Sequence, residues 1–182
     1  CGGIGTHEAV WAGVLLIVFH AIAKGLLFLC VGVIEHKIHS RNIDDMVGLI
    51  LKMPRVSVML QIGMAGMFLA PFGMLISKYA VLRAVLDSMP LLAIVIVFGS
   101  AATLFFWIKW MGSLLVVTKI HENVEKNIGL GKWTALYSLS FLTFGTCMLF
   151  PLLSRYLVVP YVKSQYHLAQ FSVMSEGNII LM

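Results

Sequence analysis

Long apolar runs constrain the fold of this chain more than any other feature. They extend over residues 9 to 34, 90 to 117 and 133 to 159, the last interrupted by Pro151, with a further one, also interrupted by a proline, over 54 to 87. A helix that crosses a bilayer needs about 20 predominantly apolar residues. The chain has 60% hydrophobic and 12% charged residues, whereas soluble domains have about 25% charged residues. We therefore predict an all-α, multi-pass membrane protein surrounded by the lipid bilayer.

The run from residue 54 to 87 predicts a single crossing that is interrupted. As one helix it would be about 50 Å long, yet two crossings and a turn need about 40 residues or more. Pro71 lacks a backbone donor and disfavours a helical residue before it, and Gly73 follows. We expect about four transmembrane helices, the second broken at Pro71 to Gly73, in a bundle over residues 1 to 163. The tail from 164 to 182 is mixed in character.

Basic residues gather in two of the connections between these runs. The first holds Lys37, Arg41, Lys52 and Arg55, and the second holds Lys119, Lys126 and Lys132. The positive-inside rule places both connections in the cytoplasm, which requires residues 54 to 87 to cross the membrane once. Because the basic residues form no stripe with aromatic residues, the net charge of +5 does not indicate nucleic acid binding. We expect a multi-pass protein of the cell's inner membrane.

Large aromatic residues fall near several predicted helix ends. An interfacial belt of tryptophan and tyrosine has this distribution. The residues expected in the belt are Trp11, Trp107, Trp110, Trp133 and Tyr161.

Lys24 lies well inside the first apolar run. It is about 22 Å along a helix from Ala9 and about 15 Å from Ile34, whereas a lysine stem reaches only about 6 Å. Ionisable groups in a membrane interior usually face a polar cavity and carry a function. His20 is one helical turn earlier, on the same face, and histidine exchanges protons near neutral pH. We therefore interpret His20 and Lys24 as a proton-passing pair, against the alternative of a structural histidine bonded to a neighbouring carbonyl.

Two further lysines lie inside apolar runs. Lys78 follows the predicted break, where backbone groups freed from the helix must contact protein or water. A functional role for Lys78 is favoured over an interfacial one. Lys109, between Trp107 and Trp110, fits a translocating group and an interfacial anchor equally well.

Glu35, His36 and His39 cluster at the cytoplasmic end of the first run. They are candidates for relaying protons to that side or for ordinary solvated residues. A metal site at His36 and His39 is not expected, since no third ligand is nearby. The three cysteines show no spacing typical of a bound cluster or haem, and no nucleophile pair or phosphate loop indicates an active site.

The sequence resembles the antiporter-like membrane subunit family. The resemblance rests on residues 19 to 28 (FHAIAKGLLF), Gly32, residues 36 to 45 and residues 71 to 78 (PFGMLISK), and it covers residues 2 to 83. That family includes the membrane subunits of respiratory complex I, of energy-converting hydrogenases and of multisubunit sodium/proton antiporters. The single proline at the break and residues 40 to 46 (SRNIDDM) are closest to the hydrogenase branch.

The resemblance implies two inverted repeats, each with a broken helix and a buried lysine. Lys24 would match the central lysine, His20 the neighbouring relay histidine, and Lys78 the lysine of the second broken helix. The chain would then be a C-terminal fragment that lacks the first repeat. Iron-sulfur clusters, with nickel in a hydrogenase, would belong to partner subunits rather than to this chain.

Three functions follow as hypotheses. The leading one is a non-catalytic subunit of a redox-driven complex, of [NiFe] hydrogenase or NADH dehydrogenase type, that translocates protons or sodium ions. Its expected partners are the other membrane and redox subunits. The alternatives are a multisubunit sodium/proton antiporter subunit and a passive membrane anchor in which the lysines are structural.

Overall fold

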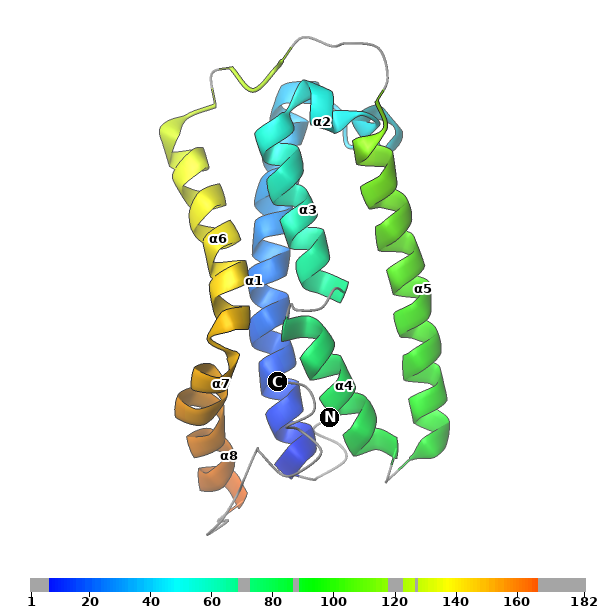
Figure 1. The fold of residues 1–182 in the computed structure, drawn as a ribbon, viewed down its shortest axis with the longest axis vertical. Helices are drawn as coiled ribbons and strands as arrows, with labels where there is room; N and C mark the ends of the chain where they lie inside the picture. The colour runs from blue at the N-terminus through cyan, green and yellow to red at the C-terminus, as the bar shows by residue number, and fades with distance from the viewer. Residues whose placement is uncertain (1–6, 69–72, 87–88, 118–122, 127, 167–182) are drawn as a thin grey trace.

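The computed structural model describes residues 7–68, 73–86, 89–117, 123–126 and 128–166, and within these ranges every regular element is a helix. Figure 1 shows an elongated bundle whose helices run along its longest axis. The elements in chain order are α1 (His7–Ile38), η2 (Asp44–Met46), α2 (Leu49–Lys52), α3 (Pro54–Phe68), α4 (Gly73–Leu86), α5 (Pro90–Leu115), α6 (Leu130–Met148), α7 (Phe150–Leu153), η3 (Ser154–Val158) and α8 (Val159–Tyr166).

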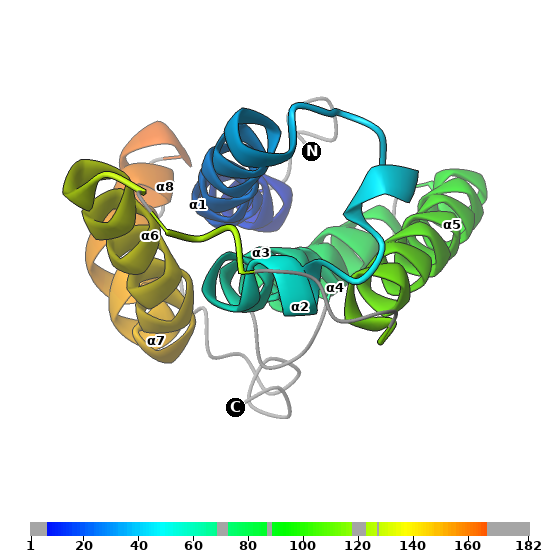
Figure 2. The ribbon, with the colours of Figure 1, turned by 90° about the horizontal axis from the view of Figure 1, so that it is seen from above.

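Helix α1 is the element around which the others pack. It contacts α3, α4 and α6. Seen from above, α1 lies next to α3, with α6 on one side and α5 on the other (Figure 2). It ends where His39 adopts φ 58° and its N–H donates to the carbonyl of Glu35 at 2.8 Å. This is the left-handed cap common at helix ends, and histidine is among the residues that tolerate it.

Two helices, α3 and α4, occupy the region of the predicted broken crossing, and whether they cross a membrane stays a prediction. Helix α3 begins at Pro54, which suits a first helical position, and ends at Phe68, while α4 begins at Gly73. In Figure 1 the two follow one another along α1. Pro71, the predicted cause of the break, lies outside the described residues.

Two of the described helices are long and apolar enough to cross a membrane, over Ala9–Ile38 and Pro90–Leu115. A third candidate is the pair Leu130–Met148 and Phe150–Ser164, which is bent by 75°. The bend falls at Leu149, just before Pro151, because a proline cannot continue the preceding helix's hydrogen bonds. The number of four crossings therefore stays a prediction.

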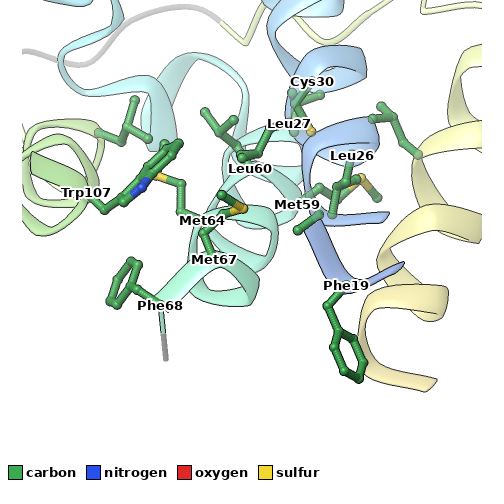
Figure 3. Packing of buried hydrophobic residues seen from close by; sticks show 14 of the residues in the cluster. Phe19, Leu26, Leu27, Cys30, Met59, Leu60, Met64, Met67, Phe68 and Trp107 are labelled. Atoms are coloured by element: carbon green, nitrogen blue, oxygen red, sulfur yellow. The ribbon is translucent and has the colours of Figure 1, made fainter. Parts of the chain in front are cut away.

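The core lies between α1 and α3. Leu26, Leu27 and Cys30 of α1 face Leu60 and neighbouring methionines of α3 (Figure 3). A Cβ on Gly63 would come within 3.0 Å of Leu27, so this glycine lets the two helices approach closely. Small residues at helix crossings have this role in membranes.

Two of the tryptophans expected in the interfacial belt are buried in the protein rather than exposed on its surface. Trp11 and Trp107 are only 5% and 7% exposed and belong to the core. Trp11 can be buried because its Nε1 donates to Ser154 Oγ at 3.0 Å, which satisfies its polar atom inside the protein. Trp107 lies more than two helical turns before the end of α5, where it packs on α3 and α1 rather than at a helix end.

Candidate functional site

Lys24 lies on the side of α1 that is turned toward α5. Its side chain is half-buried, and its Nζ lies 5.6 Å from the centre of the Trp107 ring and 6.0 Å from that of Phe28. An aromatic face attracts an ammonium group, most strongly where water is excluded. Both rings thus lie within cation–π distance of the Lys24 ammonium, the buried Trp107 ring from α5 and the exposed Phe28 ring from α1 itself.

Lys78 joins the two halves of the broken crossing. It lies in the second turn of α4, and its Nζ is 3.5 Å from the carbonyl oxygen of Met67, the penultimate residue of α3. The last four carbonyls of a helix have no partner within that helix. Lys78 therefore places its positive charge at the negative end of α3, where a cation is stabilised.

His20 completes a group of three ionisable side chains. It is exposed on α1, one turn from Lys24, and the charges of both Lys24 and Lys78 act on its ring. The structure thus brings together His20, Lys24 and Lys78, which come from helices α1 and α4. Whether they translocate ions remains a prediction.

Lys109 does not join this group in the described contacts. It is exposed on α5, two residues from Trp107 and so on nearly the opposite face of that helix. Trp107 and Trp110 stack on the inner face, with ring centres 5.6 Å apart.

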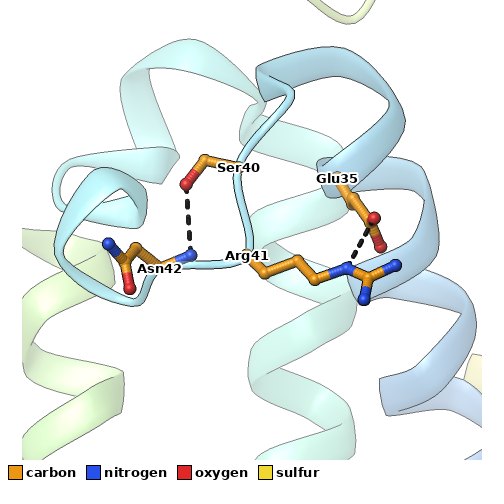
Figure 4. A network of polar contacts seen from close by, with 4 residues as sticks. All are labelled: Glu35, Ser40, Arg41 and Asn42. Atoms are coloured by element: carbon orange, nitrogen blue, oxygen red, sulfur yellow. Dashed lines mark hydrogen bonds and ion pairs between the residues drawn. The ribbon is translucent and has the colours of Figure 1, made fainter.

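Glu35 and His36 lie together in a hollow at the end of α1. The hollow has a volume of about 570 Å³ and is lined by Gly32, Glu35, His36, His39, Ser40 and Arg41. The carboxylate of Glu35 accepts a hydrogen bond from Arg41 Nε at 2.6 Å (Figure 4), and the Arg41 side chain is exposed while that of Glu35 is partly buried. In the described part of the chain, no group of three His, Cys, Asp or Glu residues is arranged to hold a metal ion.

Glu125 is a structural residue that the sequence reasoning missed. Glu125 is 9% exposed, and its carboxylate accepts a hydrogen bond from the N–H of Val56, in the first turn of α3, at 2.9 Å. The neighbouring Val124 donates to the carbonyl of Lys52 at 2.9 Å, and Lys37 reaches the carbonyl of Lys126 at 3.0 Å. A carboxylate at a helix N-terminus is stabilising, so this segment fixes the start of α3.

The partners of the lysines were missed for a different reason. Trp107 was assigned to an interface because large aromatics near run ends usually lie there. Its spacing of three residues from Trp110 and seven from Leu114 predicts one shared helical face, which is the signal that could have placed it inward. The contact of Lys78 with the carbonyl of Met67 could not be predicted from residue types, because it involves a backbone group.

The comparisons with known proteins give one match. The family described as "NADH:quinone oxidoreductase/Mrp antiporter, TM" matches residues 2–105, which hold Lys24, Lys78 and both halves of the broken crossing. Neither the curated proteins nor the solved structures gave a match.

Proposed function

Because the chain belongs to the membrane family of NADH:quinone oxidoreductases and Mrp antiporters, we propose that it carries protons or sodium ions across the membrane through Lys24 and Lys78. The single observation that supports this most is that Lys24 is half-buried with its ammonium 5.6 Å from the centre of the buried Trp107 ring. An ionisable group in a membrane interior is costly and is usually kept for function.

The proposed mechanism is electrostatic. Like charges disfavour one another strongly where the dielectric constant is low. A proton bound at Lys24 therefore favours release from the neighbouring group, and the His20 ring lies where both lysine charges act on it. Lys78 holds the far end of this group against the carbonyl of Met67.

We further propose that the driving partner is a redox complex. In this account the ion-translocating subunit carries no cofactor, and iron-sulfur clusters, with nickel in a hydrogenase, lie in partner subunits. The hydrogenase branch is favoured by the single proline at Pro71 and by residues 40 to 46. The family's own description supports the second candidate, a multisubunit sodium/proton antiporter subunit.

The test replaces Lys24 by alanine in the full-length protein within its native complex. Ion translocation should be abolished, while the redox activity of the partner subunits largely survives. Lys109→Ala, on the opposite face of α5, is measured beside it and tests whether that exposed lysine is a translocating group or an anchor. Unchanged translocation in Lys24→Ala would overturn the proposal.

The metals of the purified complex separate the candidate partners. Iron with nickel would support a hydrogenase, and iron without nickel a dehydrogenase of the NADH type. A complex that transports ions and contains neither metal would be an antiporter.

A further inference from the structure

A second hollow lies between the start of α3 and the start of α6, which are at the same end of the bundle (Figure 1). It has a volume of about 320 Å³ and is lined by Pro54, Arg55, Asn123, Glu125, Lys126 and Trp133. Helices α3 and α6 pack together, so elements in direct contact form this hollow. It shares no residue with the group of His20, Lys24 and Lys78.

The hollow has an excess of positive charge. Arg55 and Lys126 are exposed, and within the described part of the chain neither forms an ion pair. The carboxylate of Glu125 also lines the hollow, but it is already bonded to the N–H of Val56 at 2.9 Å. Lys37 adds an ammonium nearby, since its Nζ lies 3.0 Å from the carbonyl oxygen of Lys126. Two basic side chains beside the N-terminus of α3 suit an anion such as a phosphate.

Trp133 lies against the arginine of the hollow. The guanidinium carbon of Arg55 is 5.8 Å from the centre of the Trp133 ring. A guanidinium held over an aromatic face keeps the N–H donors at its edges available, and these donors bind phosphate oxygens in pairs. Tryptophan is also enriched at the level of the lipid headgroups. We therefore expect Arg55 to present its donors at that level of the membrane.

An exposed aromatic stripe on α6 begins at the hollow. From Trp133, the residues Tyr137, Phe141 and Phe144 follow at helical spacing and share one face of α6. The last three are exposed, and the ring centres of Trp133 and Tyr137 lie 5.7 Å apart. Trp133 to Phe144 covers about 16 Å along the helix, close to the roughly 15 Å of hydrocarbon in one leaflet. The stripe thus matches the length of acyl chains whose headgroup lies in the hollow.

We propose that this hollow binds one anionic phospholipid, with Arg55 and Lys126 on its phosphate and the acyl chains along Tyr137, Phe141 and Phe144. A soluble phosphate uses the two basic residues but gains nothing from the aromatic stripe. The hollow and the stripe together therefore indicate a lipid, and basic pockets between membrane helices are known to bind lipid headgroups. The inference does not depend on ion translocation by Lys24 and Lys78.

Site-specific labelling tests the headgroup contacts. The full-length protein in its complex is placed in phosphatidylcholine nanodiscs with phosphatidylglycerol that carries a photoreactive acyl chain. Mass spectrometry then measures the labelling of residues 137 to 144, with photoreactive phosphatidylcholine as the background. Arg55→Gln and Lys126→Gln should each weaken phosphatidylglycerol binding about fivefold, equal to about 1 kcal/mol per basic residue. Lys132→Gln removes an exposed charge outside the lining, so it is the matched control and should change nothing.

Two results of the labelling would overturn the inference. Equal labelling by phosphatidylglycerol and phosphatidylcholine in the wild type would mean that the hollow does not select an anionic lipid. Loss of the preference in inorganic phosphate, but not in chloride of equal ionic strength, would mean that the hollow binds a soluble anion instead. Arg55→Lys and Lys126→Arg keep the charge and should keep the preference, which separates loss of charge from loss of fold. Thermal unfolding shows whether each variant folds.

The direct test is a cryo-electron microscopy map of the complex in a bilayer that contains phosphatidylglycerol. A headgroup within hydrogen-bond distance of Arg55 and Lys126, with acyl-chain density along Phe141, is expected. A side chain of another subunit in the hollow, or a hollow without lipid, would overturn the inference. Neither result bears on ion translocation, which the Lys24→Ala variant tests separately.

Discussion

At the scale of single residues, an ammonium group within a membrane span is stable only where protein or water replaces the surrounding lipid. Lys24 has two aromatic rings and Lys78 has a backbone carbonyl. The positions of the lysines could be predicted from sequence because a charge in an apolar run stands out. Their partners could not, because Trp107 comes from α5, about 80 residues away, and the Met67 carbonyl is a backbone group.

Trp107 offers a residue-scale prediction. Trp107→Leu should slow translocation by roughly fivefold to thirtyfold, the equivalent of a desolvated cation–π contact of about 1 to 2 kcal/mol, because Lys24 loses its aromatic face. Trp107→Phe keeps an aromatic face and should retain most of the rate. Ion flux in proteoliposomes containing the full-length complex measures both. Equal rates in the two variants would show that the ring face does not act on Lys24.

At the scale of elements, contacts hold α3 at both of its ends. Glu125 accepts the Val56 N–H at the start of α3, and Lys78 of α4 lies against the last turn of α3. Both helices could be predicted, because helix length and Pro71 are local properties of the sequence. The fixation by Glu125 could not, since it joins positions 69 residues apart.

Loss of the Glu125 carboxylate should weaken α3. Glu125→Ala should lower the free energy of unfolding by about 1 kcal/mol, the usual value of a helix N-terminal acceptor. Glu125→Gln keeps an acceptor oxygen and should lose less. Thermal unfolding of the full-length protein in detergent compares the two. An alanine variant as stable as the wild type would mean that the bond to Val56 contributes nothing.

Close packing of α3 against α6 gives a second prediction at this scale. A Cβ on Gly66 would lie 3.0 Å from Thr143 Cγ2, whereas one on Gly112 of α5 would meet nothing within 4 Å. Gly66→Ala should therefore destabilise the protein by about 1 to 3 kcal/mol, as overpacking does. Gly112→Ala should be neutral or stabilising, since alanine favours a helix over glycine. The same thermal measurement serves both, and equal effects would contradict the close approach.

At the scale of the whole molecule, the distribution of basic residues predicts the orientation in the membrane, and hydropathy explains the exposed surface. Large apolar side chains such as Leu91, Phe98 and Phe105 are exposed along the length of α5. Such a surface is compatible with lipid or with neighbouring helices and not with water. The class of fold could be predicted from composition, and Pro151 marks where the last apolar run bends, whereas the angle of 75° depends on packing that the apolar pattern does not encode.

The orientation is directly testable. In a background without the native cysteines, Asn42→Cys should react with a membrane-impermeant thiol reagent only from the cytoplasmic side. Met89→Cys, at the opposite end of the bundle and 51% exposed, should react only from the other side (Figure 1). Labelling of Asn42→Cys from outside would reverse the assigned topology.

The central claim is that Lys24 and Lys78 carry the translocated ion. The most direct measurement is proton or sodium uptake per turnover by the reconstituted full-length complex, in the wild type and in a variant with both Lys24→Ala and Lys78→Ala. The account predicts that uptake disappears in the double variant while turnover of the driving reaction continues. Full uptake in a folded double variant would contradict it and would leave the chain as a passive membrane anchor.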